Sequence, residues 1–354
     1  MKKTIITTII IIIPALILSH YAEPLILKFI YPIRNIYYFG TTKDYSIENK
    51  VIKRKYKHLD SDSAVFNPVI YVNFYHNIIN NILNDSIYPG YIDLKNKKEQ
   101  HTNVELLRAA NYLITKADTI IINGRVSYAF PYNFYYDSYG GLDSGWVSGL
   151  AQGNACKMFL AAYCISKDSI YLRYAEKAMN LLDVEIKDGG VKVELKNGYW
   201  YEEYAQKNKM RSPLVLNGHI FSIDALFYLS KISSNQLYKK LLTNGVNAVE
   251  NNIHNYSFKG LWSKYDLWNS FNFASYKYHK IHIEQLKRLL KIQNKKKSNI
   301  NHYRKLFIFD LIIPIGFSLR LLLLRNNMVI IIFLVSLSII TSIFLIIKCL
   351  KRTF

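Results

Sequence analysis

Trp146 to Ser166 reads WVSGLAQGNACKMFLAAYCIS, an apolar stretch long enough for a helix of about six turns. Lys167-Asp168-Ser169 interrupts this stretch, and Ile170 to Val184 predicts the next helix. Two helices joined by so short a break are expected to lie antiparallel as a helical hairpin.

The same arrangement continues on both sides of this hairpin. Asn217 can cap a helix from Gly218 to Ile232, and Gln236 to Asn251 predicts its partner. Apolar residues at helical spacing also occur from Val104 to Lys116. Repeated helical hairpins predict a mainly α fold, an (α/α) toroid-type array, which we place at residues 66–290.

One stretch has the pattern of a β-hairpin instead. Val191 to Leu195 alternates, Asn197-Gly198 is a strong hairpin turn signal, and Tyr199 to Tyr204 alternates again. We expect this hairpin to deliver acid and phenol groups to one mouth of the array. Regular alternation would place Glu203 on the strand face opposite Tyr204, unless the strand twists or ends there.

Charge is distributed unevenly along the 354 residues. The chain carries 46 Lys and Arg against 25 Asp and Glu, and residues 286–354 contribute 13 of the cations and one acid, Asp310. Because this basic tail adjoins apolar segments, a membrane surface explains it better than nucleic acid, which we exclude as a partner. Three cysteines cannot form a disulfide framework.

Both ends of the chain have membrane-like segments. Residues 1–33 are basic and then apolar, which favours an uncleaved anchor, followed by a linker at 34–65. We expect a basic linker at 291–305 and a transmembrane helical hairpin at 306–349, with arms from Leu306 to Leu324 and from Met328 to Ile347. Membrane lipid is thus an expected partner, but the positive-inside rule leaves the face of the middle domain open.

Phenols and carboxylates concentrate in four segments, 132–137, 199–204, 265–268 and 276–282. Five motifs, in this order along the chain, resemble motifs of the D-glucuronyl C5-epimerase family. They are GWVSGLAQG at 145–153, WYEEY at 200–204, VLNG at 215–218, YDL at 265–267 and YHxxHIxQL from Tyr278. The family continues YDL with Arg-His, whereas Trp268 and Asn269 follow here.

The resemblance implies an (α/α) toroid that inverts C5 of D-glucuronic acid residues within a polysaccharide, giving L-iduronic acid, with no cofactor and no metal. Its catalytic residues carry over to Glu203, Tyr204, Tyr265 and Tyr278. We expect further residues to bind the uronic-acid-containing polysaccharide: Tyr132, Asn133, Trp146, Gln152, Trp200, Glu202, Asn217, His279 and His282. Whether the chain forms a homodimer stays open.

These residue types suit the chemistry. Removing the C5 proton next to a carboxylate creates an enolate-like dianion, and inversion needs a base on one face and an acid on the other. A neutral Tyr is a suitable acid, and either a tyrosinate or Glu203 is the base. His279 and His282 could neutralise the substrate carboxylate.

Two alternatives remain open on the sequence alone. A polysaccharide lyase would share the C5 proton abstraction and then eliminate at C4, and a hydrolase would need two carboxylates that flank the bond. A membrane-anchored glycan-binding protein without catalysis would bind the chain without proton exchange.

Overall fold

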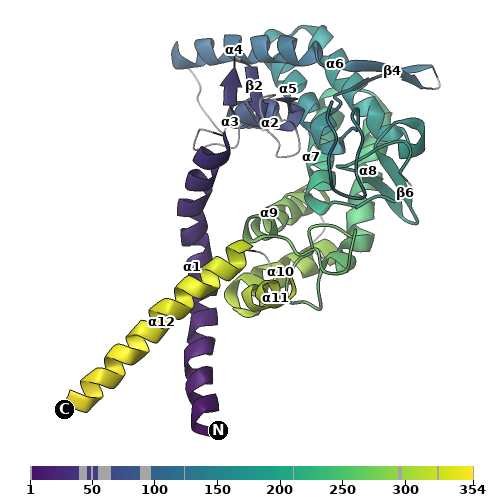
Figure 1. Ribbon diagram of the computed structural model, residues 1–354. Coiled ribbons are helices and arrows are strands. Elements are labelled where there is room, and N and C mark those ends of the chain that lie inside the picture. Colours follow the sequence, from purple (N-terminus) through teal and green to yellow (C-terminus); the bar gives the residue numbers. More distant parts are fainter. Residues whose placement is uncertain are drawn as a thin grey trace.

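The computed structural model describes residues 2–39, 46–48, 51–54, 65–87, 97–122, 124–209, 211–293, 297–324 and 327–353. They form a helical array with short strands on its rim, and two long helices extend from it (Figure 1). In Figure 1 these two helices, α1 (Lys2–Phe39) and α12 (Asn327–Thr353), cross each other, and the two chain ends lie far from the array.

Three helical hairpins within the described residues build most of the array. They are α5 (Gly149–Ser166) with α6 (Ser169–Asn180), α7 (Leu216–Ile232) with α8 (Gln236–Asn252), and α9 (Tyr276–Gln293) with α10 (Asn299–Ile312). Before them, α2 (Pro68–Phe74), α3 (His76–Ile87) and α4 (Lys97–Ile114) pack against α5. Because α3, α5, α7 and α9 face a common cavity, the predicted toroid-type array is confirmed.

Several helix ends differ from the predicted ones, because side chains or neighbouring segments bind the backbone groups at those ends. Ser148 caps α5, so Trp146 lies before the helix and pairs with Tyr132 in an isolated β-bridge. Asn217 is not a cap, because Leu216 already donates its N–H to Tyr265 O and α7 begins there. Helix α6 ends at Asn180, and one 3₁₀ turn (Leu181–Asp183) follows it.

The β-hairpin forms as β6 (Lys192–Leu195) and β7 (Gly198–Tyr201). Its turn is Lys196-Asn197, one residue before the expected Asn197-Gly198, and Gly198 opens β7 at φ 144°. A second hairpin pairs β4 (Asp118–Ile122) with β5 (Arg125–Ala129). The predicted linker at 34–65 is not one: α1 continues to Phe39, and β1 (Ser46–Glu48) and β2 (Val51–Arg54) join β3 (Val65–Phe66) in a small sheet.

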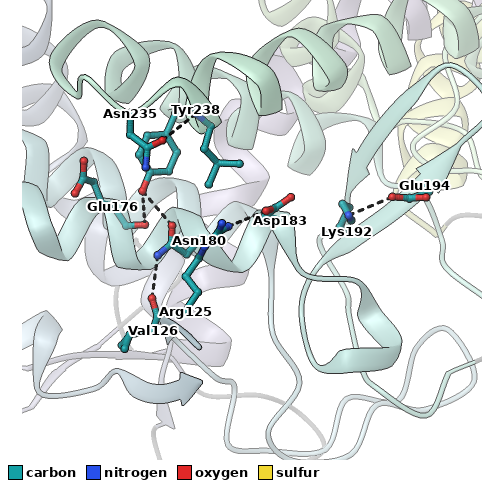
Figure 2. A network of polar contacts seen from close by, with 10 residues as sticks. Arg125, Val126, Glu176, Asn180, Asp183, Lys192, Glu194, Asn235 and Tyr238 are labelled. Carbon is teal, nitrogen blue, oxygen red and sulfur yellow. Dashed lines mark hydrogen bonds and ion pairs between the residues drawn. The ribbon is translucent and has the colours of Figure 1, made fainter. Parts of the chain in front are cut away.

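A polar network ties the β4–β5 hairpin to the outer helices (Figure 2). Arg125 lies 2.7 Å from Asp183, and Asn180 donates from Nδ2 to Val126 O at 2.9 Å. The Tyr238 hydroxyl of α8 donates to Asn180 Oδ1 at 3.0 Å. This buried phenol therefore holds outer helices together and lies away from the mouth.

The C-terminal region corrects two expected boundaries. Ile300 and Phe307 of α10 are buried in the main core, and Glu250 accepts hydrogen bonds from the first N–H groups of the helix. The expected basic linker at 291–305 is therefore largely the last hairpin of the array. Helix α11 (Ile315–Leu324) follows α10 at an 84° bend, so Leu306 to Leu324 is not a straight arm.

Among the described residues, two helices are long and apolar enough to cross a membrane, at Ile6–Ile33 of α1 and Val329–Lys348 of α12. Helices α1 and α12 pack mainly against each other. The hairpin expected between α11 and α12 is therefore not the main packing of α12. Arg320 of α11 donates to both carboxylate oxygens of Glu23 in α1 at 2.7 and 2.6 Å, with both side chains buried. Arg320 also lies over the Trp262 ring, which joins α1 to the array.

Candidate active site

A cavity of about 400 Å³ opens at the mouth of the array, between α2, the segment after β7, α7 and α9. It brings together six of the predicted site residues from five separate segments of the chain. These are Tyr132, Trp146, Glu203, Tyr204, Asn217 and Tyr278. Tyr265 lies directly behind them, with its ring edge-on to that of Tyr278 at a centroid distance of 4.8 Å.

Glu203 and Tyr204 both reach the cavity because β7 ends at Tyr201. The chain then turns around the buried carboxylate of Glu202, which accepts hydrogen bonds from Glu203 N (2.7 Å) and Leu214 N (2.6 Å). The alternation expected through Tyr204 therefore stops before it could separate Glu203 from Tyr204. Glu202 itself is fully buried and outside the cavity lining, so it positions the turn and is not a substrate contact.

The two neighbouring carboxyls differ in electrostatic environment. Burial raises the pKa of Glu202 to about 7, while backbone N–H groups favour its ionised form. Burial, together with the charge of Glu202, raises the pKa of Glu203 to about 8. The charge of Glu202 therefore makes Glu203 harder to ionise. The buried Oε2 atom of Glu203 has no hydrogen-bond partner among the described residues.

The glycine after Asn217 allows Glu203 to lie against α7. A Cβ atom at Gly218 would lie 2.3 Å from Glu203 Oε2 and 2.7 Å from its Cβ. Any larger residue at this position would displace the carboxyl. The VLNG segment thus contributes Asn217 to the cavity and, through Gly218, space for Glu203.

Phenols continue from Glu203 into the protein. Tyr204 lies beside both Glu203 and Tyr265, and the Tyr265 ring contacts that of Tyr278. Burial, followed by the charge of Glu203, holds the pKa values of Tyr204 and Tyr265 well above the usual value of a phenol. Both phenols are therefore neutral proton donors in the resting site.

An aromatic wall continues from Tyr204 along the cavity. The Tyr132 and Trp146 rings stack at 3.8 Å between centroids, and Tyr136 and Tyr204 stack at 5.5 Å. Trp146 is fixed by a hydrogen bond from Nε1 to Phe134 O. Flat aromatic faces of this kind suit the apolar faces of sugar rings.

Lys277 is a cavity residue that the sequence analysis missed. It lies in the first turn of α9, beside Tyr278, and is the one Lys or Arg among the described residues that line the cavity. The sequence feature that could have indicated Lys277 is its position directly before the YHxxH motif. It can supply the positive charge that a uronate needs.

The two histidines expected to supply that charge lie elsewhere. His279 stacks on Trp262 and bonds to Ser263 Oγ through Nδ1 (2.7 Å) and to Phe307 O through Nε2 (2.9 Å). His282 shares the Ser263 hydroxyl at 3.0 Å. Burial lowers the pKa of both rings to about 3, so they are neutral and cannot balance a carboxylate.

Three further expected contacts also lie outside the cavity. Gln152 is buried, and its amide bonds to Phe130 N, Tyr128 O and Ala178 O, so it fixes the β5 segment. Trp200 is buried between His219 and Tyr256. Asn133 is exposed and lines a separate small hollow beside Pro131. Within the described residues, no group of three or more His, Cys, Asp or Glu could hold a metal ion.

Comparison with known proteins adds to this geometry. A family model described as D-glucuronyl C5-epimerase C-terminus matches residues 123–308. An uncharacterised protein of Methanocaldococcus jannaschii is 28% identical over 253 residues, which are 65% of this chain and 80% of that protein. A D-glucuronyl C5-epimerase of Caenorhabditis elegans is 30% identical over 163 residues, which are 41% of this chain and 26% of that protein.

Among solved structures, a GH76 alpha-mannanase of Bacteroides thetaiotaomicron aligns with a TM-score of 0.47 and 12% sequence identity. The alignment covers 80% of this chain and 69% of the mannanase.

Proposed function

This chain belongs to the D-glucuronyl C5-epimerase C-terminus family, and we propose that it inverts C5 of D-glucuronic acid residues within a polysaccharide. One observation carries the proposal: the mouth cavity combines a carboxyl poised to ionise with neutral phenols and an aromatic wall. The family relation makes the chain an epimerase-type isomerase, and the substrate and direction are our inference.

The proton balance assigns a role to each group. Ionised Glu203 takes the proton from C5, and the electron pair moves into the substrate carboxylate as an enolate-like dianion. Tyr278 then donates its phenolic proton to the opposite face of C5. The resulting tyrosinate recovers a proton that passes from Glu203 through Tyr204 and Tyr265, which returns the site to its starting state. Each general acid or base step contributes about 10²–10⁴ in rate.

Lys277 has the charge role in this scheme. The dianion gains negative charge at the carboxylate oxygens, and an ammonium group at the cavity wall stabilises that charge more strongly than it stabilises the substrate. Substrate carboxylate at Lys277 would also orient C5 between Glu203 and Tyr278.

The test is incubation of the detergent-solubilised full chain with a glucuronic-acid polymer in D₂O, followed by NMR. We expect deuterium at C5 and new iduronic acid signals. Ultraviolet-absorbing unsaturated ends would indicate a lyase instead, and new reducing ends without them a hydrolase. Binding without deuterium at C5 would contradict catalysis and favour a glycan-binding protein.

For the membrane, we propose two crossings, by α1 and α12, with both chain ends on one side and the array on the other (Figure 1). Lys2 and Lys3 flank one crossing, and Lys348, Lys351 and Arg352 flank the other. These cations at the chain ends favour cytoplasmic ends, and two crossings then place the array, with the cations at 287–305, on the opposite face. Reporter domains fused to each end should both be cytoplasmic. Ends on opposite faces would contradict two crossings.

A further inference from the structure

A second cavity of about 450 Å³ lies further along the inner helices α3, α5, α7 and α9. It shares two wall residues, Phe221 and Ile281, with the mouth cavity. The two cavities therefore adjoin each other along the inner helices, and we call the pair the groove. Arg288 is ten residues after Tyr278 on α9, so it lies about 15 Å along the helix from the reacting phenol.

The wall of this second cavity carries excess positive charge. Asp224 accepts from Lys157 Nζ at 3.0 Å and from Arg288 Nε at 2.6 Å, so two cations meet one carboxylate. The Nη2 atom of Arg288 is buried and has no hydrogen-bond partner among the described residues. Gln285 is also buried, and its Oε1 atom likewise lacks a partner within the described part of the chain.

The remaining charges at this cavity lie at its rim. Lys280 is exposed one helical turn from Glu284, and the Glu284 side chain is mostly solvated and lies near Lys287. His76 faces the cavity from α3, where burial lowers its pKa. Three cations, Lys157, Lys280 and Arg288, thus line this cavity against two carboxylates, Asp224 and Glu284, so its wall favours an anion.

We propose that this cavity is a remote subsite for a second uronate carboxylate of the same glycan chain. The inference rests on the proposed function, because a polymer with acidic sugars that reacts at the mouth would extend along the groove. Arg288 binds the remote carboxylate, Asp224 and Lys157 hold Arg288 in place, and Lys280 adds charge at the rim. The subsite would thus select long acidic chains over short ones.

The test measures binding by calorimetry on the detergent-solubilised full chain. The probes are a disaccharide and a hexasaccharide of alternating glucuronic acid and N-acetylglucosamine, and a hexasaccharide with its carboxyls reduced to alcohols. Arg288→Gln should weaken acidic hexasaccharide binding about tenfold or more and leave disaccharide binding unchanged. Lys280→Gln, which leaves the Asp224 ion pairs intact, should weaken binding of the acidic hexasaccharide less than Arg288→Gln does. Lys291→Gln is the control, since Lys291 is exposed on the same helix and does not line the cavity.

Hexasaccharide affinity at the wild-type level in both Arg288→Gln and Lys280→Gln would overturn the subsite. Equal weakening of both chain lengths by Arg288→Gln would overturn it too, because the effect would then belong to the mouth cavity. Binding is measured independently of turnover, so the subsite and the proposed epimerase function can each be contradicted without the other. Missing deuterium at C5 with Arg288-dependent binding would remove the epimerase function and keep the subsite.

Discussion

The two faces of α9 carry residues of one short motif and use them differently. Tyr278 faces the open mouth cavity, where Glu203 Oε2 has no hydrogen-bond partner within the described part of the chain, whereas His279 and His282 face a filled interior around Trp262 and Ser263. Both ring nitrogens of His279 are hydrogen-bonded, which fixes the last hairpin of the array to the segment that contacts Arg320. Similar titratable side chains therefore serve chemistry on one face and anchorage on the other.

The largest expected effect is on the cavity face of α9. Tyr278→Phe removes only a hydroxyl, so packing is retained, and we expect epimerisation to fall by about 10²–10⁴ with an unchanged unfolding midpoint. The measurement is formation of the inverted, C5-deuterated product in D₂O by NMR. Tyr135→Phe is the control, since that phenol is half exposed and outside the cavity lining. Wild-type inversion in Tyr278→Phe would contradict the distinction between the two faces.

Glu203→Gln should lower turnover by at least about 10², because glutamine cannot accept the C5 proton. In the wild type, turnover should rise with pH through about 8, where Glu203 ionises.

The same ionisation should change stability in the opposite direction to turnover. The pKa of Glu203 is higher in the folded than in the unfolded chain, so its contribution to the free energy of unfolding is fully present below the unfolded pKa of about 4.3 and is lost as pH rises through about 8. At pH 7–8 Glu203→Gln should therefore unfold at higher temperature than the wild type. A variant that is less stable and still active would contradict both assignments.

A smaller effect is expected from Gly218→Ala. The added Cβ would lie only 2.3 Å from Glu203 Oε2 and 2.7 Å from its Cβ, so the Glu203 side chain must shift. We expect turnover to fall about tenfold, since a modest misplacement of a general base costs less than its removal. Wild-type turnover with an intact fold would show that the close approach of Gly218 has no role in positioning the base.

The smallest effect on chemistry is expected on the buried face of α9. His279→Gln should lower the free energy of unfolding by about 1–3 kcal/mol, because buried hydrogen bonds to Ser263 and Phe307 are lost or distorted. Turnover per folded molecule should stay close to that of the wild type. Loss of turnover without loss of stability would indicate that His279 takes part in the reaction.

The sequence predicted the helical hairpins and the β-hairpin because apolar spacing and turn residues are local signals. Its motifs also contain Glu203, Tyr204 and Tyr278, which the structure brings to one cavity. It misplaced Glu202, Gln152 and the histidines, since their partners, such as Leu214 N and Phe307 O, come from distant segments. Residues 306–324 were misjudged because apolar content does not reveal the 84° bend between α10 and α11.

The central claim is that one face of α9 performs proton transfer and the other holds the fold. Its most direct test is the rate at which the inverted, C5-deuterated product forms per folded molecule, measured side by side for Tyr278→Phe and His279→Gln. We expect a folded, inactive Tyr278→Phe and a less stable, active His279→Gln. An active Tyr278→Phe together with a folded, inactive His279→Gln would contradict the account.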